Sequence, residues 1–202
     1  MFGLIILGAL GIYFLVIIAV TWFAYYCAAK NGSSFGKRLL AAAVGFLIIY
    51  LPVFWDHIPT IVVHNYYCEK EAGFWVYKTL DQWRAENPRV SESLVANKND
   101  TSTRQGDMVN YIDTYFVNKR FNLIVKHNGK LFLNRWRHER QLIDISSNEV
   151  LARFVDFSTS QEQRQAGWSG WKIWLDYKFC SGGRDRQIEF GNFYLQFKGA
   201  QQ

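Results

Sequence analysis

The chain has 202 residues and a formal net charge of +6, from 23 Lys and Arg against 17 Asp and Glu. All 17 acidic residues lie from Asp56 onward together with 20 of the basic ones, so the larger part of the chain is too nearly balanced to predict nucleic-acid binding. The sequence also contains no nucleotide-binding, nucleophile-elbow or zinc-finger pattern, which leaves the common enzyme classes without support.

The first predicted element is an apolar run from Phe2 to Tyr26 that contains no charge and no proline. A helix of about 20 such residues crosses a hydrocarbon layer ~30 Å thick. A signal peptide is the alternative. It fits less well, because no basic residue precedes the run and the run is longer than the apolar region of a signal peptide. The run therefore predicts a transmembrane helix.

A second apolar run extends from Leu39 to Trp55. A surface helix of a soluble domain would carry a polar face, and Leu40 to Phe54 has none. A helix buried inside a soluble domain is the alternative. We predict that residues 1–56 form a transmembrane hairpin joined by loop 28–38.

Small residues recur at helical spacing in both runs. They form two pairs, Ala24 with Ala28 and Ala41 with Gly45. Such pairs let helices approach closely in lipid, so they predict the packing surface of the hairpin or contact with another protein's helix.

The loop between the runs carries Lys30, Lys37 and Arg38 and no acidic residue. Short loops rich in Lys and Arg stay in the cytoplasm, so the N-terminus and residues 57–202 are predicted on the opposite side. Thiols in an oxidising compartment tend to pair. We therefore predict a disulfide between Cys68 and Cys180, with two buried free thiols as the alternative.

From residue 57 the pattern predicts one α+β domain. Its first half should contain a helix, a strand, a short helix capped by Asp81 and a long polar loop: His64–Ala72, Phe74–Leu80, Gln82–Glu86 and Asn87–Asp107.

A hairpin follows, with a two-residue turn at Asn128 and Gly129, which is a strong hairpin signal. The predicted register places two apolar pairs opposite each other, Val125 with Phe132 and Phe121 with Trp136. Further strands are predicted at Leu142–Ile145, Val150–Phe157, Trp171–Cys180 and Ile188–Phe197. Together they predict a largely antiparallel sheet of five to six strands.

The four histidines form no zinc-finger pattern and no CxxC pair is present, so neither a metal nor another cofactor is predicted. Aromatic residues and arginine are enriched where proteins meet partners. The candidate partner-binding residues are Trp168, Trp174, Arg135, Arg137 and Arg140, although packing inside the domain and a solvated strand face explain the same residues.

The segment from His64 to Pro88 resembles a pattern of uncharacterised small membrane-anchored proteins of Gram-negative bacteria. The resemblance rests on Tyr67-Cys68-Glu69-Lys70-Glu71-Ala72-Gly73 followed by Val76-Tyr77-Lys78-Thr79. It implies a bacterial inner membrane and a periplasmic domain, and it implies no activity and no site residues.

Two functions are compatible with these observations. The first is a non-enzymatic, membrane-anchored interaction protein, either an accessory subunit or an envelope factor, with the lipid bilayer and another protein as partners. The second is a periplasmic ligand-binding or hydrolytic domain whose site is assembled from distant residues. Its candidate residues are Arg104, Asp107, Arg135, His138 and Glu139.

Overall fold

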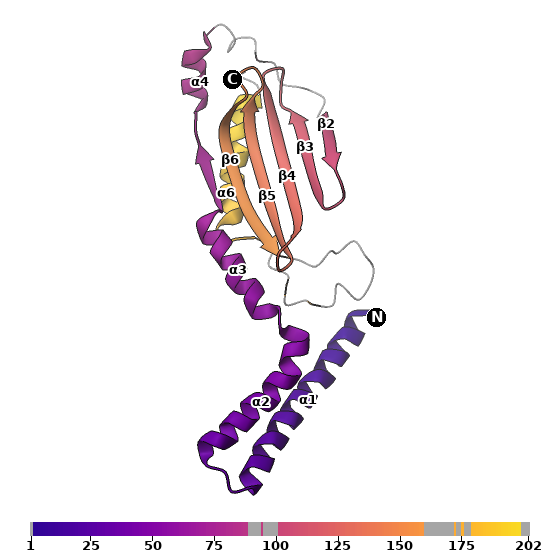
Figure 1. Cartoon of the computed structure of the whole chain (residues 1–202). Coiled ribbons are helices and arrows are strands. Elements are labelled where there is room, and N and C mark those ends of the chain that lie inside the picture. The colour runs from indigo at the N-terminus through magenta and orange to yellow at the C-terminus, as the bar shows by residue number, and fades with distance from the viewer. Residues whose placement is uncertain are drawn as a thin grey trace. The chain divides into compact units, whose positions relative to one another are not determined.

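The computed structural model describes residues 2–88, 94, 101–159, 172, 175 and 179–198. The chain divides into two compact units, Met1–Pro59 and Thr60–Gln202 (Figure 1).

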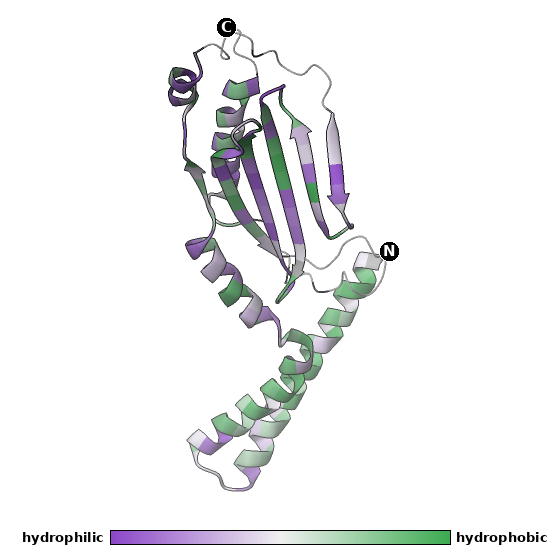
Figure 2. Ribbon diagram, turned by 45° about the horizontal axis from the view of Figure 1, so that its top comes forward, coloured by the Kyte–Doolittle hydropathy of each residue, from purple (hydrophilic) through white to green (hydrophobic). Residues whose placement is uncertain are grey.

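The N-terminal unit is built on two antiparallel helices, α1 (Phe2–Lys30) and α2 (Phe35–Phe54). Both are long and apolar enough to cross a membrane, by length and composition (Figure 2). They approach closely at Gly45, where an added Cβ would lie 3.0 Å from Ala24 Cβ. The structure thus places one residue of each predicted small pair at a helix contact, and it places Ala28 and Ala41 on the same two helices.

The next elements differ in their boundaries from the prediction. α3 (His57–Lys70) begins seven residues before the predicted helix, so most of the expected linker after Trp55 is helical. It is followed by β1 (Gly73–Val76) and α4 (Leu80–Glu86).

The predicted cap of α4 was wrong, because Thr79 and not Asp81 precedes the helix. Thr79 Oγ1 accepts a hydrogen bond from the Gln82 N–H at 3.3 Å, and Gln82 Oε1 accepts one from the Thr79 N–H at 2.9 Å. This reciprocal capping box satisfies two helix donors that Asp81 could not reach from inside the first turn.

The domain contains a six-stranded antiparallel sheet in the order β1-β6-β5-β4-β3-β2. The predicted antiparallel sheet is confirmed, but two of its strands come from other segments than expected. The remaining strands are β2 (Ser102–Gly106), β3 (Asn110–Phe116), β4 (Phe121–Leu131), β5 (Arg135–Asp144) and β6 (Glu149–Thr159). β2 lies within the segment predicted as a loop.

The last predicted strand, Ile188–Phe197, was wrong. Its residues belong to α6 (Gly183–Lys198), which lies against the sheet (Figure 1). Phe190, Phe193 and Phe197 are buried on it, and their spacing of three and four is that of one helix face. The predicted strand Trp171–Cys180 lies mostly outside the described residues. Leu175, which is described, makes a local turn in which its N–H donates to Lys172 O at 3.1 Å.

The hairpin of β4 and β5 exists, but its predicted turn and register were wrong. The chain turns at residues 132–134, where Leu133 and Asn134 have φ of 59° and 55°. Val125 therefore lies opposite Arg140 instead of Phe132, and Phe121 opposite Asp144 instead of Trp136. Asn128 and Gly129 stand at an irregularity within β4.

The local reason is the packing of Gly129. Its N–H donates to Val109 O at 3.2 Å and to Asn110 Oδ1 at 3.1 Å, both near the start of β3. A Cβ at Gly129 would lie 2.3 Å from the Trp136 ring, so the glycine makes room for that ring. These tertiary contacts override the turn preference of the Asn-Gly pair.

Cross-strand partners point to the same side of a sheet, which defines two faces. The α6 face carries Phe74, Phe121, Leu123, Val125, His127, His138, Arg140, Phe154 and Ser158. The α3 face carries Arg135, Arg137, Glu139, Arg153, Val155 and Phe157.

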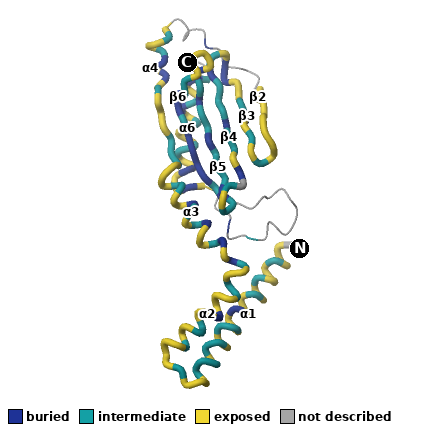
Figure 3. The backbone as a smooth tube through the Cα atoms, in the orientation of Figure 1, coloured by how far each residue is buried: buried dark blue, intermediate teal, exposed yellow. Residues whose placement is uncertain are grey.

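The main core lies on the α6 face, where Phe121 packs on Phe197 and Phe154 on Phe190. A smaller apolar cluster joins Val155 and Phe157 of the α3 face to Tyr67 of α3. Burial is deepest along β6, and β2 is exposed throughout (Figure 3).

Candidate functional site

A pocket of about 420 Å³ opens on the α6 face, and α6 contributes to its wall. The alternation of β4 turns Leu123, Val125 and His127 into it. Other lining residues are Tyr115 of β3, Arg140 of β5, and Tyr194 and Lys198 of α6. The pocket therefore combines apolar walls with cationic and phenolic groups, as small-molecule sites commonly do.

Arg140 is the distinctive residue of this pocket. Burial lowers the pKa of its guanidinium, and the neighbouring phenols of Tyr115 and Tyr194 oppose that effect. The group still carries its charge, because arginine is not deprotonated in proteins. Within the described residues its side chain makes no salt bridge and no hydrogen bond. A half-buried cation of this kind is suited to receive an anion.

Arg104 lies on the same face and provides a contrast. Its Nε and Nη2 donate to the two carboxylate oxygens of Asp113 at 2.6 and 2.7 Å. This bidentate contact lowers the pKa of Asp113. Arg104 also stacks over the Tyr111 ring at 4.2 Å. Its charge is thus satisfied inside the domain, whereas that of Arg140 faces the pocket.

A hydrogen-bonded chain of side chains leaves the pocket at His127. Its Nδ1 lies 3.0 Å from His138 Nδ1, and His138 Nε2 lies 2.8 Å from Ser158 Oγ. Two proton arrangements satisfy this chain. In the first, Ser158 donates to His138 and His138 donates to His127. In the second, His127 donates to His138 and His138 donates to Ser158.

Burial lowers the pKa of His138 to about 4, and the nearby charges of His127 and Arg140 act in the same direction. Burial also lowers the pKa of His127, with Asp113 opposing and Arg140 adding to the effect. The pKa of about 4 keeps the His138 ring neutral at pH 7. A histidine with such a low pKa is a weak base, so the contact with Ser158 is poorly suited to activate a nucleophile.

The residues proposed for a distant-residue site do not line one pocket. Arg104 and His138 share the α6 face, where His127 and Asp113 lie between them. Asp107 instead holds the β2–β3 turn, because its Oδ1 accepts hydrogen bonds from the N–H groups of Val109 and Asn110.

The other predicted residues of β5 lie on the opposite face. Glu139 binds Arg137 at 3.2 Å and Arg153 at 2.7 Å. Arg135 stacks on the Tyr67 ring, with its Cζ 3.3 Å from the ring centroid. Arg135 and Arg137 therefore do not form one surface with Arg140. Trp168 and Trp174 lie outside the described residues.

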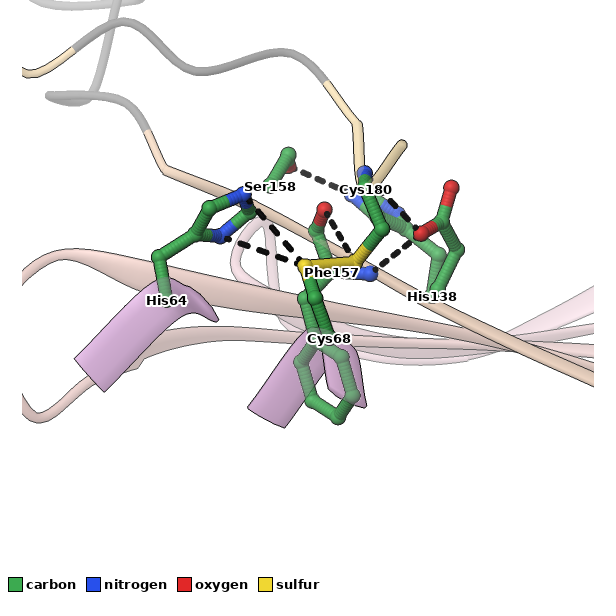
Figure 4. Close-up of a disulfide and its surroundings, with 7 residues drawn as sticks. His64, Cys68, His138, Phe157, Ser158 and Cys180 are labelled. Carbon is green, nitrogen blue, oxygen red and sulfur yellow. Dashed lines mark hydrogen bonds between the residues drawn. A yellow bond between two sulfur atoms is a disulfide. The ribbon is translucent and has the colours of Figure 1, made fainter. Parts of the chain in front are cut away.

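Cys68 of α3 and Cys180, which lies just before α6, are at disulfide distance, with their Cα atoms 5.4 Å apart (Figure 4). The buried ring of His64 faces the bridge, and its Nε2 lies 3.4 Å from Cys68 Sγ. Burial and the charge of Arg135 lower the pKa of His64. Cys180 is fixed from the sheet side, because its N–H donates to Asp156 Oδ1 at 3.2 Å.

The sequence contained a signal for this cluster that the prediction did not use. His64 and Cys68 are four residues apart, which places them on one side of a helix. Their ligand atoms and that of Cys180 all lie within 4.8 Å of one another. The pocket around Arg140 had no comparable signal, because the strand register and α6 were both predicted differently.

No protein-family model matches this sequence. No solved structure matches the chain either.

Lowering the pH should destabilise the domain through His138. The folded-state pKa of about 4 lies below the ordinary value near 6.5, so the unfolded chain binds the proton more readily. This contribution is complete above pH 6.5 and is lost as the pH falls toward 4. We expect a loss of about 2 to 3 kcal/mol, allowing for partial exposure.

The measurement is urea unfolding of the full chain in detergent at pH 7 and pH 4.5. His138→Gln should reduce the difference between the two pH values by most of that amount. His57→Gln, which changes a histidine of the other unit, should leave it as in the wild type. An equal difference in all three proteins would contradict the prediction.

Proposed function

We propose that this chain is a membrane-anchored, non-enzymatic binding protein whose domain takes up a small organic anion. In this proposal α1 and α2 anchor the chain in a bilayer, and residues 57–202 lie on the side opposite the loop 28–38. The basic loop, without acidic residues, supports a cytoplasmic position for that loop. The cysteine pair supports an oxidising compartment for the domain. The resemblance of residues 64–88 points to a bacterial inner membrane and its periplasm.

A reporter fusion tests this topology. Alkaline phosphatase fused after Gln202 should be active, because that enzyme folds only where disulfides form. A green fluorescent protein fused after Lys37 should fluoresce, because the loop is proposed to be cytoplasmic. An inactive phosphatase and a fluorescent protein at Gln202 would together place the domain in the cytoplasm and reject the proposal.

The observation that carries the binding function is Arg140. A charged guanidinium that is half-buried, and that has no hydrogen-bonded or ionic partner within the described residues, lies in a pocket with a second cationic residue, Lys198. Leu123 and Val125 supply apolar wall, so the ligand class is an anion with an apolar body, such as an aromatic carboxylate or sulfonate.

Ligand binding is favoured over hydrolysis for a separate reason. The Ser158–His138 contact lacks a competent base, because the pKa of His138 is too low. Ligand binding is also favoured over the accessory-subunit hypothesis. Three of the candidate partner-binding residues, Arg135, Arg137 and Arg140, are divided between the two faces of the sheet.

The test measures binding of naphthalene-2-sulfonate to the full chain in nanodiscs of zwitterionic lipid, by equilibrium dialysis. Arg140→Met should weaken binding at least tenfold, because a hydrogen bond to a charged group contributes about 1.5 to 3 kcal/mol. Arg137→Met is the matched control on the same strand and opposite face, and it should bind within twofold of wild type. Equal binding by the wild type and Arg140→Met would reject the pocket as the site.

A further inference from the structure

The disulfide region shares no residue with the Arg140 pocket, so a site there would be independent of the proposed function. We propose that, when the Cys68–Cys180 bond is reduced, His64, Cys68 and Cys180 together bind one Cu⁺ ion.

The ligands are brought together by two different segments. His64 and Cys68 lie one turn apart on α3, and Cys180 approaches from the chain that leads into α6 (Figure 4). The three ligand atoms lie within 4.8 Å of one another. Two thiolates and one imidazole are soft and intermediate ligands, which suit Cu⁺ and Zn²⁺. Three ligands are one fewer than structural zinc normally takes, so the ligand number favours Cu⁺ over Zn²⁺.

The surrounding charge supplies an independent observation. Arg135 is 9 % exposed, and within the described part of the chain its Nε has no hydrogen-bond partner. The side chain stacks on Tyr67, the neighbour of Cys68, and is close enough to His64 to act on it electrostatically. A neutral disulfide gives this buried cation no anion to pair with. Two thiolates with one Cu⁺ carry a net charge of −1, which the guanidinium would balance.

Reduction requires two electrons, and a dithiol is the reductant class that this step needs. One dithiol sulfur attacks Cys68 Sγ, which is half-buried, whereas Cys180 is 5 % exposed. The Sγ–Sγ bond breaks, and its electron pair stays on Cys180, which takes up a proton. The second dithiol sulfur then displaces Cys68 as a thiol and leaves an oxidised dithiol. Binding of Cu⁺ releases the two thiol protons.

The experiment uses the full chain in nanodiscs, with Cys27→Ser in every variant so that the free thiol of α1 does not contribute. The protein is reduced, freed of reductant under argon, and titrated with Cu⁺ against a colorimetric Cu⁺ chelator. The reduced protein should withdraw one Cu⁺ per chain, and the oxidised protein none. His64→Ala should weaken Cu⁺ binding at least tenfold. His57→Ala, on the same helix, should bind as the reduced parent does.

Cys68→Ser should abolish the stoichiometric binding. If that variant fails to fold, X-ray absorption at the copper edge tests the site in the Cys27→Ser parent. With Cu⁺ bound, the parent should show two sulfur ligands and one nitrogen ligand. Binding by His64→Ala equal to that of the parent, or a spectrum with sulfur ligands alone, would overturn the site. Equal binding by the oxidised and reduced proteins would do the same.

Discussion

Replacing Phe121 with alanine should lower the free energy of unfolding of the domain by about 3 to 5 kcal/mol. The side chain is fully buried at the start of β4. Its ring meets Trp83 of α4 edge to face, with 4.8 Å between centroids, and meets Phe197 of α6 at 5.1 Å. The substitution removes contacts to two helices at once and leaves a cavity that the sheet backbone cannot close.

The measurement is urea unfolding of the full chain in detergent, followed by tryptophan fluorescence, to which the buried Trp83 contributes. Phe132→Ala is the matched control, because Phe132 is 75 % exposed at the hairpin turn. It should change the stability by no more than about 0.5 kcal/mol. A loss below about 1 kcal/mol for Phe121→Ala would mean that α4 and α6 do not pack on β4 as described.

The contacts of Trp83 show why Phe121 is so sensitive. The Trp83 Nε1–H donates to Asp144 Oδ2 at 2.8 Å, and Arg120 Nε lies 2.7 Å from Asp144 Oδ1. Burial opposes ionisation of Asp144, but the bonds from Trp83 and Arg120 lower its pKa overall. The aromatic cluster is therefore attached to a buried ion pair, and movement of Trp83 would leave Asp144 with fewer partners.

The parts of the fold that the sequence predicted are those encoded by short-range pattern. The two long helices follow from uncharged runs, and β5 and β6 follow from apolar segments on either side of Ser146, Ser147 and Asn148. In that turn Asn148 takes a positive φ of 56°, as its residue type allows. Local chemistry and tertiary structure agree at these places, so the pattern sufficed.

The errors occur where two periodicities compete. In α6 the pairs Ile188 with Phe190 and Leu195 with Phe197 are two residues apart, which suggested a strand. The set Phe190, Phe193 and Phe197 has helical spacing, and these are the side chains that the sheet buries. The choice between the two depended on what the segment packs against, which the sequence alone does not specify.

The pocket could not be predicted for a related reason. It requires Arg140 opposite Val125. The predicted Asn-Gly turn would have placed Arg140 opposite Val117, which lies before the start of β4. The pocket also requires Tyr194 on a helix. A site assembled from β3, β4, β5 and α6 can be predicted only if every strand register and the helix are predicted correctly. The disulfide could be predicted without them, from the expected compartment and the number of cysteines.

Removing the disulfide should have an effect as large as that of Phe121→Ala. The double variant Cys68→Ser, Cys180→Ser opens a loop with a sequence separation of 112 residues. By the chain-entropy account, a loop of this length stabilises the folded state by about 3 to 5 kcal/mol. The bridge also ties the end of α3 to the chain beside β6, where Thr159 Oγ1 donates to Leu175 O at 2.6 Å.

The same urea unfolding, at pH 7 without reductant, measures this effect. Cys27→Ser is the matched control, because Cys27 is a free thiol of α1, and it should leave the unfolding of the domain unchanged. Adding a dithiol should lower the stability of the wild type toward that of the double variant and should not change the double variant itself. If the wild type unfolds at the same urea concentration as the double variant, with and without the dithiol, the Cys68–Cys180 bond does not stabilise the domain and the prediction is wrong.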